Sequence, residues 1–183
     1  LQILALFTKG YDKEYYIREV QHILKISPRT SQLILNDLEK KGILESETKG
    51  KIRLYRLKEN YTTMEYMIFV EQYKKMIFMQ KNLKVRELAN MVFRFTQGIV
   101  IIFGSYAKGT QKEDSDVDVL VVGDYNKREF KKVAKVLDLE VNVKHYPLGD
   151  FSEEIRDDIF LRVVLENHII ITGADSFMTA LME

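Results

Sequence analysis

The sequence predicts a mixed α/β (α+β) protein, in which a helical N-terminal part is followed by a part built around a small sheet. Three helical patterns precede an alternating stretch at residues 45–57, and two apolar runs at 99–103 and 117–122 stand among helical patterns further on. Net charge is +5 over residues 1–58 and −6 over residues 98–183. We therefore expect two parts with different tasks, the first of them facing a polyanion.

Composition excludes several classes of protein. The chain has 183 residues and is 46% hydrophobic, which is enough for real cores. No apolar run approaches the roughly 18 residues of a membrane span, so we expect no membrane partner. The sequence contains no cysteine, which excludes disulfides and a thiolate zinc site and fits the cytoplasmic location that we expect.

Helical spacing predicts three helices in the first part. The first covers residues 2–7 and the second residues 13–24. The third begins sharply, because Ser27 can cap its N-terminus and Pro28 suits the first helical position, and it runs to about residue 41, before Gly42. Its inward face should consist of Ile34, Leu35 and Leu38.

Residues 45–57 alternate as a β-hairpin that turns at 48–51, and three helices with a basic hairpin make a winged helix-turn-helix. Residues 1–58 resemble winged-helix transcription regulators in the Ser-Pro helix start, the Leu-Glu-Lys-Lys-Gly-Ile-Leu exit at 38–44 and the Tyr-Arg-Leu end of the wing. The resemblance implies that helix 28–41 enters the major groove of duplex DNA.

The residues expected to contact DNA lie on that helix and on the wing. The helix offers Arg29, Gln32 and Asn36 to base edges, with Thr30 beside them, and the wing offers Lys49, Lys51 and Arg53 to phosphate. The alternative is that these are ordinary solvated side chains on a helical interaction domain.

A helical segment at 59–84 should link this part to a second domain at 85–183. Residues 61–80 should form a helix that is apolar over much of its circumference. Its apolar and aromatic side chains are Met64, Tyr66, Met67, Ile68, Phe69, Val70, Tyr73, Met76 and Ile77. Such a helix must be covered, either as core between the domains or as the interface of a homodimer, which is the state that we expect. A further helix at 85–97 should turn Leu88, Met91, Val92 and Phe95 towards the sheet.

The apolar run at 99–103 reads as a buried strand that ends at Gly104-Ser105. Glycine there allows close approach to a ligand, and the following N–H groups and the Ser105 hydroxyl can donate to phosphate oxygens. Asp116 and Asp118 leave the next strand on the same face, about 6.8 Å apart along the chain. Two carboxylates without a nearby histidine or cysteine suit Mg²⁺ or Mn²⁺ held together with substrate phosphates.

This order of strand, Gly-Ser, polar loop and Ser-Asp-x-Asp resembles the fingerprint of the DNA polymerase β-like nucleotidyltransferases, especially the small minimal ones. The resemblance implies a domain with a small mixed sheet. It also implies that Gly104 and Ser105 hold a nucleoside triphosphate, and that Asp116 and Asp118 bind metal ions and serve catalysis.

The third strand departs from that family's pattern. Active members place a third carboxylate there, and aligning residues 141–143 with the usual triplet puts Asn142 in its position. An amide carries no charge and takes no proton. Glu140 shares the face with Asn142 and is the candidate for a substituted catalytic carboxylate, at a shifted position.

The remaining segments complete the second domain. A basic amphipathic helix is expected at 126–137, a strand at 139–146, one helix at 152–167, and an edge strand or packed tail at 168–173. His22, His145 and His168 show no metal-site spacing and should be structural.

We expect a DNA-binding transcription regulator whose second domain binds a nucleotide with Mg²⁺. The rival is a working nucleotidyltransferase that moves a nucleoside monophosphate onto a hydroxyl of a protein or small molecule. A third possibility is an interaction protein in which both sites have decayed.

Overall fold

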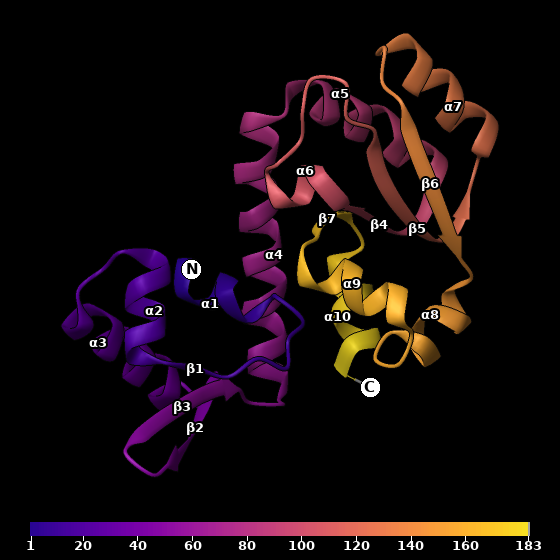
Figure 1. The fold of residues 1–183 in the computed structure, drawn as a ribbon. Helices are drawn as coiled ribbons and strands as arrows, with labels where there is room; N and C mark the ends of the chain where they lie inside the picture. Colours follow the sequence, from indigo (N-terminus) through magenta and orange to yellow (C-terminus); the bar gives the residue numbers. More distant parts are fainter. Residues whose placement is uncertain (183) are drawn as a thin grey trace. The chain divides into compact units, whose positions relative to one another are not determined.

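A computed structural model of the chain describes residues 1–182, and its contacts divide the chain between Val70 and Glu71. The first unit, Leu1–Val70, contains a three-stranded sheet, and the second, Glu71–Glu183, contains a four-stranded sheet. Helix α4 (Tyr61–Lys81) begins in the first unit and ends in the second (Figure 1). The fold is therefore mixed α+β, as the sequence predicts.

The first unit contains three short helices and a hairpin. Its elements are α1 (Gln2–Phe7), β1 (Tyr15–Tyr16), α2 (Ile17–Leu24), α3 (Pro28–Lys40), β2 (Leu44–Lys49) and β3 (Ile52–Leu57). The strands lie in the order β1-β3-β2, with both pairings antiparallel. Ser27 caps α3 as predicted, because its Oγ accepts a hydrogen bond from the Thr30 backbone N–H at 3.0 Å.

The helix predicted at 13–24 is wrong in its first turn. Tyr15 and Tyr16 form β1, paired with Tyr55 and Leu54 of β3. The Tyr15 ring packs edge-on against Phe7 with centroids 5.0 Å apart, and its hydroxyl donates to the Leu6 carbonyl at 3.0 Å. Burial of this ring in the core outweighs the local helical spacing.

Helix α3 turns a narrower face inward than predicted. Leu35 and Leu38 are buried as expected, together with Ser31, but Ile34 is 39% exposed. Successive residues of a helix are rotated by about 100° about its axis, so Ile34 points away from the narrow buried face that carries Leu35.

Helix α4 is apolar around its circumference, and different parts of it are buried to different degrees. Met67 and Val70 are fully buried, whereas Phe69 and Met76 are 59% and 58% exposed. Met67 therefore belongs to the chain's own core and cannot serve as an interface residue. Among residues 1–182, no helix is both long and apolar enough to cross a membrane.

The second unit is built around a mixed sheet with the strand order β6-β5-β4-β7. Its elements after α4 are α5 (Leu83–Val92), the short 3₁₀ helix η1 (Phe93–Phe95), β4 (Thr96–Phe103), α6 (Gly104–Lys108), β5 (Val117–Tyr125), α7 (Lys127–Val136), β6 (Val141–Tyr146), α8 (Leu148–Glu154), α9 (Ile159–Glu166), β7 (Ile169–Thr172) and α10 (Ala174–Met182). Strand β5 runs parallel to β6 and antiparallel to β4, which in turn is antiparallel to the edge strand β7.

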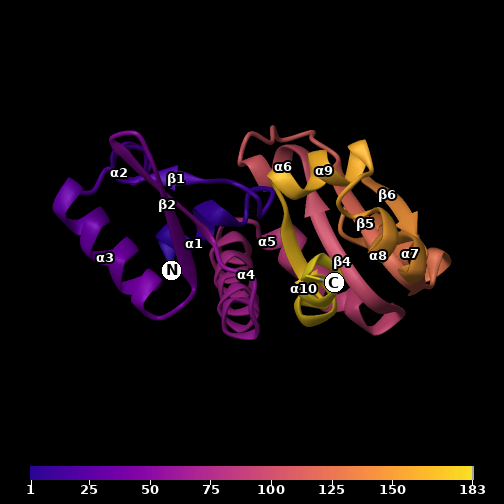
Figure 2. The same ribbon diagram turned by 90° about the horizontal axis from the view of Figure 1, so that it is seen from below.

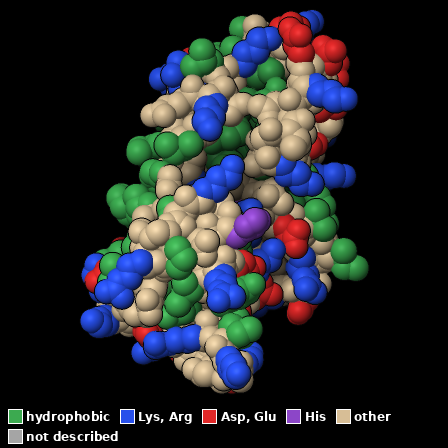
Figure 3. Space-filling model, turned by 60° about the vertical axis from the view of Figure 1, so that its left-hand side comes forward, with side chains coloured by type: hydrophobic (Ala, Val, Ile, Leu, Met, Phe, Trp, Pro, Cys, Tyr) green, Lys and Arg blue, Asp and Glu red, His purple; other side chains and the backbone are tan. Residues whose placement is uncertain are grey.

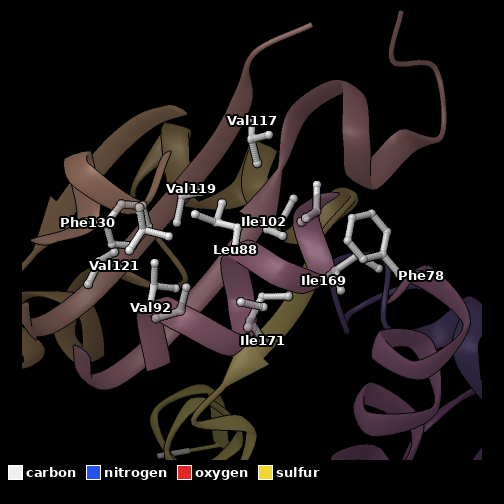
Figure 4. Close-up of a cluster of buried hydrophobic side chains, with 14 residues drawn as sticks. Phe78, Leu88, Val92, Ile102, Val117, Val119, Val121, Phe130, Ile169 and Ile171 are labelled. Carbon is white, nitrogen blue, oxygen red and sulfur yellow. The ribbon is translucent and has the colours of Figure 1, made fainter. Parts of the chain in front are cut away.

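Helices cover both faces of this sheet (Figures 1 and 2). Helices α5 and α7 cover one face, and Figure 4 shows Leu88, Val92 and Phe130 packed against side chains of β4 and β5 such as Ile102 and Val119. Helices α8, α9 and α10 lie towards the other face, which carries Ile101, Leu120 and their neighbours. Leu88 and Val92 are buried as predicted, whereas Met91 is 38% exposed.

The single helix predicted at 152–167 is also wrong. Two helices stand there, and Asp158 starts the second because its Oδ1 accepts the Leu161 N–H at 2.8 Å as an N-cap. The break leaves Ile159 81% exposed. The run at 168–173 supplies an edge strand, one of the two predicted outcomes, and α10 was not predicted.

A buried polar cluster joins α4 to the start of β7. The Lys74 ammonium donates to Glu71 Oε1 at 2.7 Å and lies 3.4 Å from His168 Nε2, while His168 Nδ1 donates to the Leu165 carbonyl at 2.8 Å. Burial acts to raise the pKa of Glu71, but His168 and Lys74 outweigh it and lower that pKa to about 2. Burial and the Lys74 charge lower the pKa of His168. The imidazole is therefore neutral at pH 7, where Lys74 is the cation that keeps Glu71 ionised.

This cluster should make the protein sensitive to mild acid. The pKa of His168 lies below its ordinary 6.5 in the folded state, so as pH falls below 6.5 the unfolded state takes up the proton first and stability declines. Glu71, with a pKa of about 2 against an ordinary 4.5, adds a second loss between these values. Urea unfolding at pH 7.5 and 5.5 should show the first decline, and His168→Gln should flatten it. His22→Gln, at an exposed histidine, is the control. Equal pH dependence in all three proteins would contradict this assignment.

Candidate functional site

The turn from β4 into α6 forms one wall of the candidate site. Gly104 follows Phe103 directly and has a φ of +69°, a left-handed conformation that favours glycine. A Cβ built at Gly104 would overlap with the carboxylate of Asp118. The Asp118 carboxylate therefore occupies the space that a side chain at position 104 would fill. Ser105 follows in the first turn of α6.

Strand pairing brings a second polar side chain to Asp118. Asp118 lies opposite Phe103 of β4 and opposite Asn142 of β6. Asp116 precedes β5, and Asn142 Nδ2 donates to its Oδ2 at 3.0 Å. The structure thus gathers Asp116, Asp118 and Asn142 on one face of the sheet, beside Gly104.

The predicted third carboxylate does not join this group. Glu140 lies just before β6, where its backbone carbonyl accepts the Val117 N–H at 2.8 Å, and its side chain is exposed. Within residues 1–182, no group of three His, Cys, Asp or Glu side chains is arranged to hold a metal ion. Asn142, rather than a third acid, lies beside the two aspartates: its amide binds Asp116, and its backbone is paired with Asp118.

The donor set suits a hard divalent cation that also takes ligands from phosphate. Asp116 and Asp118 provide carboxylate oxygens, and the Asn142 amide can provide a neutral oxygen if it turns over. Mg²⁺ is commonly bound through one or two carboxylates together with substrate phosphates. Gly104 has no side chain, which leaves room for the Asp118 carboxylate beside the backbone of the turn. This arrangement also fits a cation bound together with phosphate.

Two anchors of the loop between α6 and β5 were not predicted. Gln111 Nε2 donates to Asn82 Oδ1 at 3.0 Å, and the Ser115 hydroxyl accepts the Lys112 N–H at 2.8 Å. These bonds hold the loop that leads to Asp116. Gln111 and Asn82 are 29 residues apart, so no local pattern connects them.

Two of the four DNA-contact candidates on α3 are exposed, and the other two make hydrogen bonds within the first unit. Arg29 and Gln32 are exposed. Thr30 Oγ1 is 2.8 Å from the Ser27 hydroxyl, within the helix cap. Asn36 Oδ1 accepts the Tyr55 hydroxyl at 2.8 Å, which ties this side chain to β3.

Two of the three wing cations have acidic partners in the same unit. Lys49 Nζ lies 3.2 Å from Glu14 and 3.7 Å from Glu47. Arg53 binds Glu39 at 2.6 Å through Nη2 and the Ser46 hydroxyl at 2.7 Å through Nε. Lys51 makes no ion pair within the described residues. Figure 3 shows one face of the molecule, on which hydrophobic side chains lie among Lys and Arg side chains.

A match to a known protein family covers the part of the second unit that contains the candidate site. Residues 84–171 match the family described as nucleotidyltransferase domain, and this range contains the β4–α6 turn, both aspartates and Asn142. The chain therefore carries a nucleotidyltransferase-like domain. None of the curated proteins compared with the chain matches it.

Two solved structures are distantly similar. A toxin–antitoxin structure with AMP-PNP has 19% identity and a TM-score of 0.33, covering 54% of this chain and 81% of that chain. TrmBL2, an archaeal chromatin protein, has 17% identity and a TM-score of 0.28, covering 87% of this chain and 65% of that chain. At these TM-scores neither likeness assigns a function.

Gly104→Ala should test the contact between the turn and Asp118. Gly109 is the matched control, because its φ is +70° but a Cβ there would meet nothing within 4 Å. Left-handed strain alone should make Gly109→Ala cost about 1–2 kcal/mol of unfolding free energy. Gly104→Ala should cost more, and Asp118→Ala should reduce the difference in a double-mutant cycle. Equal costs for the two glycine variants in urea unfolding would reject the contact.

Proposed function

We propose that the second domain binds a nucleoside triphosphate together with Mg²⁺ or Mn²⁺, and that the first unit is a winged helix-turn-helix that binds duplex DNA. The protein would then be a cytoplasmic transcription regulator that carries a nucleotide-binding domain. The observation that carries the proposal is the packing of the Asp118 carboxylate against Gly104, with Asp116 beside it.

This arrangement supports binding because each part has a separate role. Gly104 and Ser105 would hold the phosphates at the end of β4, while Asp116 and Asp118 would hold the cation that bridges to them. The family match over residues 84–171, a range that contains these four residues, supports the proposal.

The amide of Asn142 argues against turnover. Asn142 meets Asp116 where a third carboxylate would help to deprotonate the attacking hydroxyl, and an amide takes no proton. The alternative function is an active nucleotidyltransferase that transfers a nucleoside monophosphate to a hydroxyl of a protein or small molecule. The observation in its favour is that both aspartates lie on one face of the sheet, and Glu140, two residues before Asn142, would have to turn towards them to serve as the base.

The DNA-binding proposal rests on the exposed Arg29 and Gln32 of α3 and on Lys51 in the turn of the hairpin. Lys49 and Arg53 would also contact phosphate, but each must first exchange an acidic partner for it. Thr30 and Asn36 would also contact DNA while keeping their bonds to Ser27 and Tyr55. A homodimer through exposed residues of α4, such as Phe69, would match a two-fold operator.

A nucleoside triphosphate with Mg²⁺ should raise the melting temperature. A ligand that binds only the folded state stabilises it by about 2.7 kcal/mol at a hundredfold excess over Kd. Asp116→Asn should abolish the rise, and Ser105→Ala should reduce it. Asp124→Asn, an exposed position at the far end of β5, is the control and should leave the rise unchanged. If no triphosphate shifts the melting temperature with either metal, both the binding proposal and the enzyme alternative fail.

Duplex DNA should be bound in a salt-dependent way. Lys51→Gln should weaken binding to all sequences and lower the salt slope by about one unit, as expected for one lost phosphate contact. Arg29→Ala should instead relax the choice of sequence. Lys9→Gln, an exposed lysine that follows α1, is the matched control. Absence of any gel retardation at low salt, over random and genomic fragments, would reject DNA binding.

A further inference from the structure

Lys144 lies on the same face of the sheet as the candidate site. The parallel register pairs Asp118 with Asn142 and Leu120 with Lys144. Because side chains alternate along a strand, Lys144 leaves β6 on the face that carries Asn142, about 6.6 Å further along. The ammonium of a lysine can reach over that distance towards the site.

Three other lysines of the unit already have polar partners. Lys74 is paired with Glu71, Lys132 with Glu129, and Lys75 donates to the carbonyl of Ile171. Lys144 is exposed and has no ion-pair partner in the part of the chain that the structure describes. Its charge is therefore available to a ligand that binds beside Asp118.

Aromatic rings lie on the same face of the sheet as Lys144. Tyr146, the next residue of β6 on this face, stacks on Phe160 of α9 with centroids 6.2 Å apart and an angle of 5° between the rings. Phe160 also meets Phe103 edge-on at 5.4 Å. Along β6, Lys144 thus lies between Asn142 of the candidate site and the ring of Tyr146.

The charge on this face differs from that of a three-carboxylate site. At the site, Asp116 and Asp118 carry two negative charges and Asn142 carries none, while Lys144 adds a positive charge. Glu140, two residues before Asn142, is a further negative charge, but it is exposed and lies before the strand. A two-metal displacement uses a pair of divalent ions clamped between carboxylates and phosphate. Here a second ion would lack one carboxylate ligand and would face an ammonium.

We propose that the site binds one divalent cation rather than two, and that the Lys144 ammonium contacts the nucleotide phosphates in place of the second ion. This inference rests on the proposed nucleotide binding and defines the ligand as a triphosphate carrying a single metal. A lysine ammonium is a strong donor to phosphate oxygens and supplies the positive charge without needing carboxylate ligands.

Metal counting and nucleotide affinity test the proposal together. In the presence of a non-hydrolysable nucleoside triphosphate analogue, Mn²⁺ titration followed by electron paramagnetic resonance should give one bound ion per chain. Asn142→Asp should raise this number to two. Lys144→Gln should weaken binding of the analogue with Mg²⁺ about tenfold, which corresponds to about 1.4 kcal/mol, without changing the number of ions. Lys131→Gln on α7, at the other face of the sheet, is the matched control and should bind as the wild type does.

The outcomes separate this inference from the proposed function. Two Mn²⁺ ions per wild-type chain, or equal affinity in Lys144→Gln and wild type, would overturn the inference while nucleotide binding stands. No binding of the analogue to the wild type with either metal would overturn both. Because Lys144 is exposed, its substitution leaves the core intact, and circular dichroism verifies folding of the variant.

Discussion

The register between β5 and β6 determines which side chains can meet at the candidate site. Asp118 and Asn142 are paired residues of two parallel strands, and the next pair on the same face is Leu120 with Lys144. A shift of one residue would move Asn142 and Lys144 to the face covered by α5 and α7. The valines on that face are buried, so burial of the core fixes the register and thereby the composition of the site.

The fold could be predicted from the sequence wherever local signals and packing agree. Ser27-Pro28 sets the start of α3, and the apolar runs of β4 and β5 are strands, because no other local structure competes at these positions. Tyr15 and the segment at 152–167 were mispredicted for different reasons. The strand partner of Tyr15 lies 40 residues away, and Asp158 caps a new helix inside a continuous helical pattern.

The candidate site was predictable as a set of residues but not as a set of contacts. The spacing of Asp116 and Asp118 placed them on one face, and alignment placed Asn142 opposite them. The sequence could not show that the amide of Asn142 binds Asp116, that Gly104 makes room for Asp118, or that Gln111 is anchored on Asn82. Each of these depends on residues that the fold brings together over 14 or more positions of the chain. The same limit hid the acidic partners of Lys49 and Arg53.

The bonds of Arg53 have a consequence for the hairpin itself. Its guanidinium binds Glu39 at the end of α3 and Ser46 on β2, and lies 5.3 Å from the centre of the Tyr55 ring. One side chain thus joins the helix to both strands of the hairpin. A hairpin that is already ordered has less conformational entropy to lose when it meets a partner, so association requires less rearrangement of this surface. Rigidity of the hairpin, rather than its charge, is what Arg53 contributes to the isolated protein.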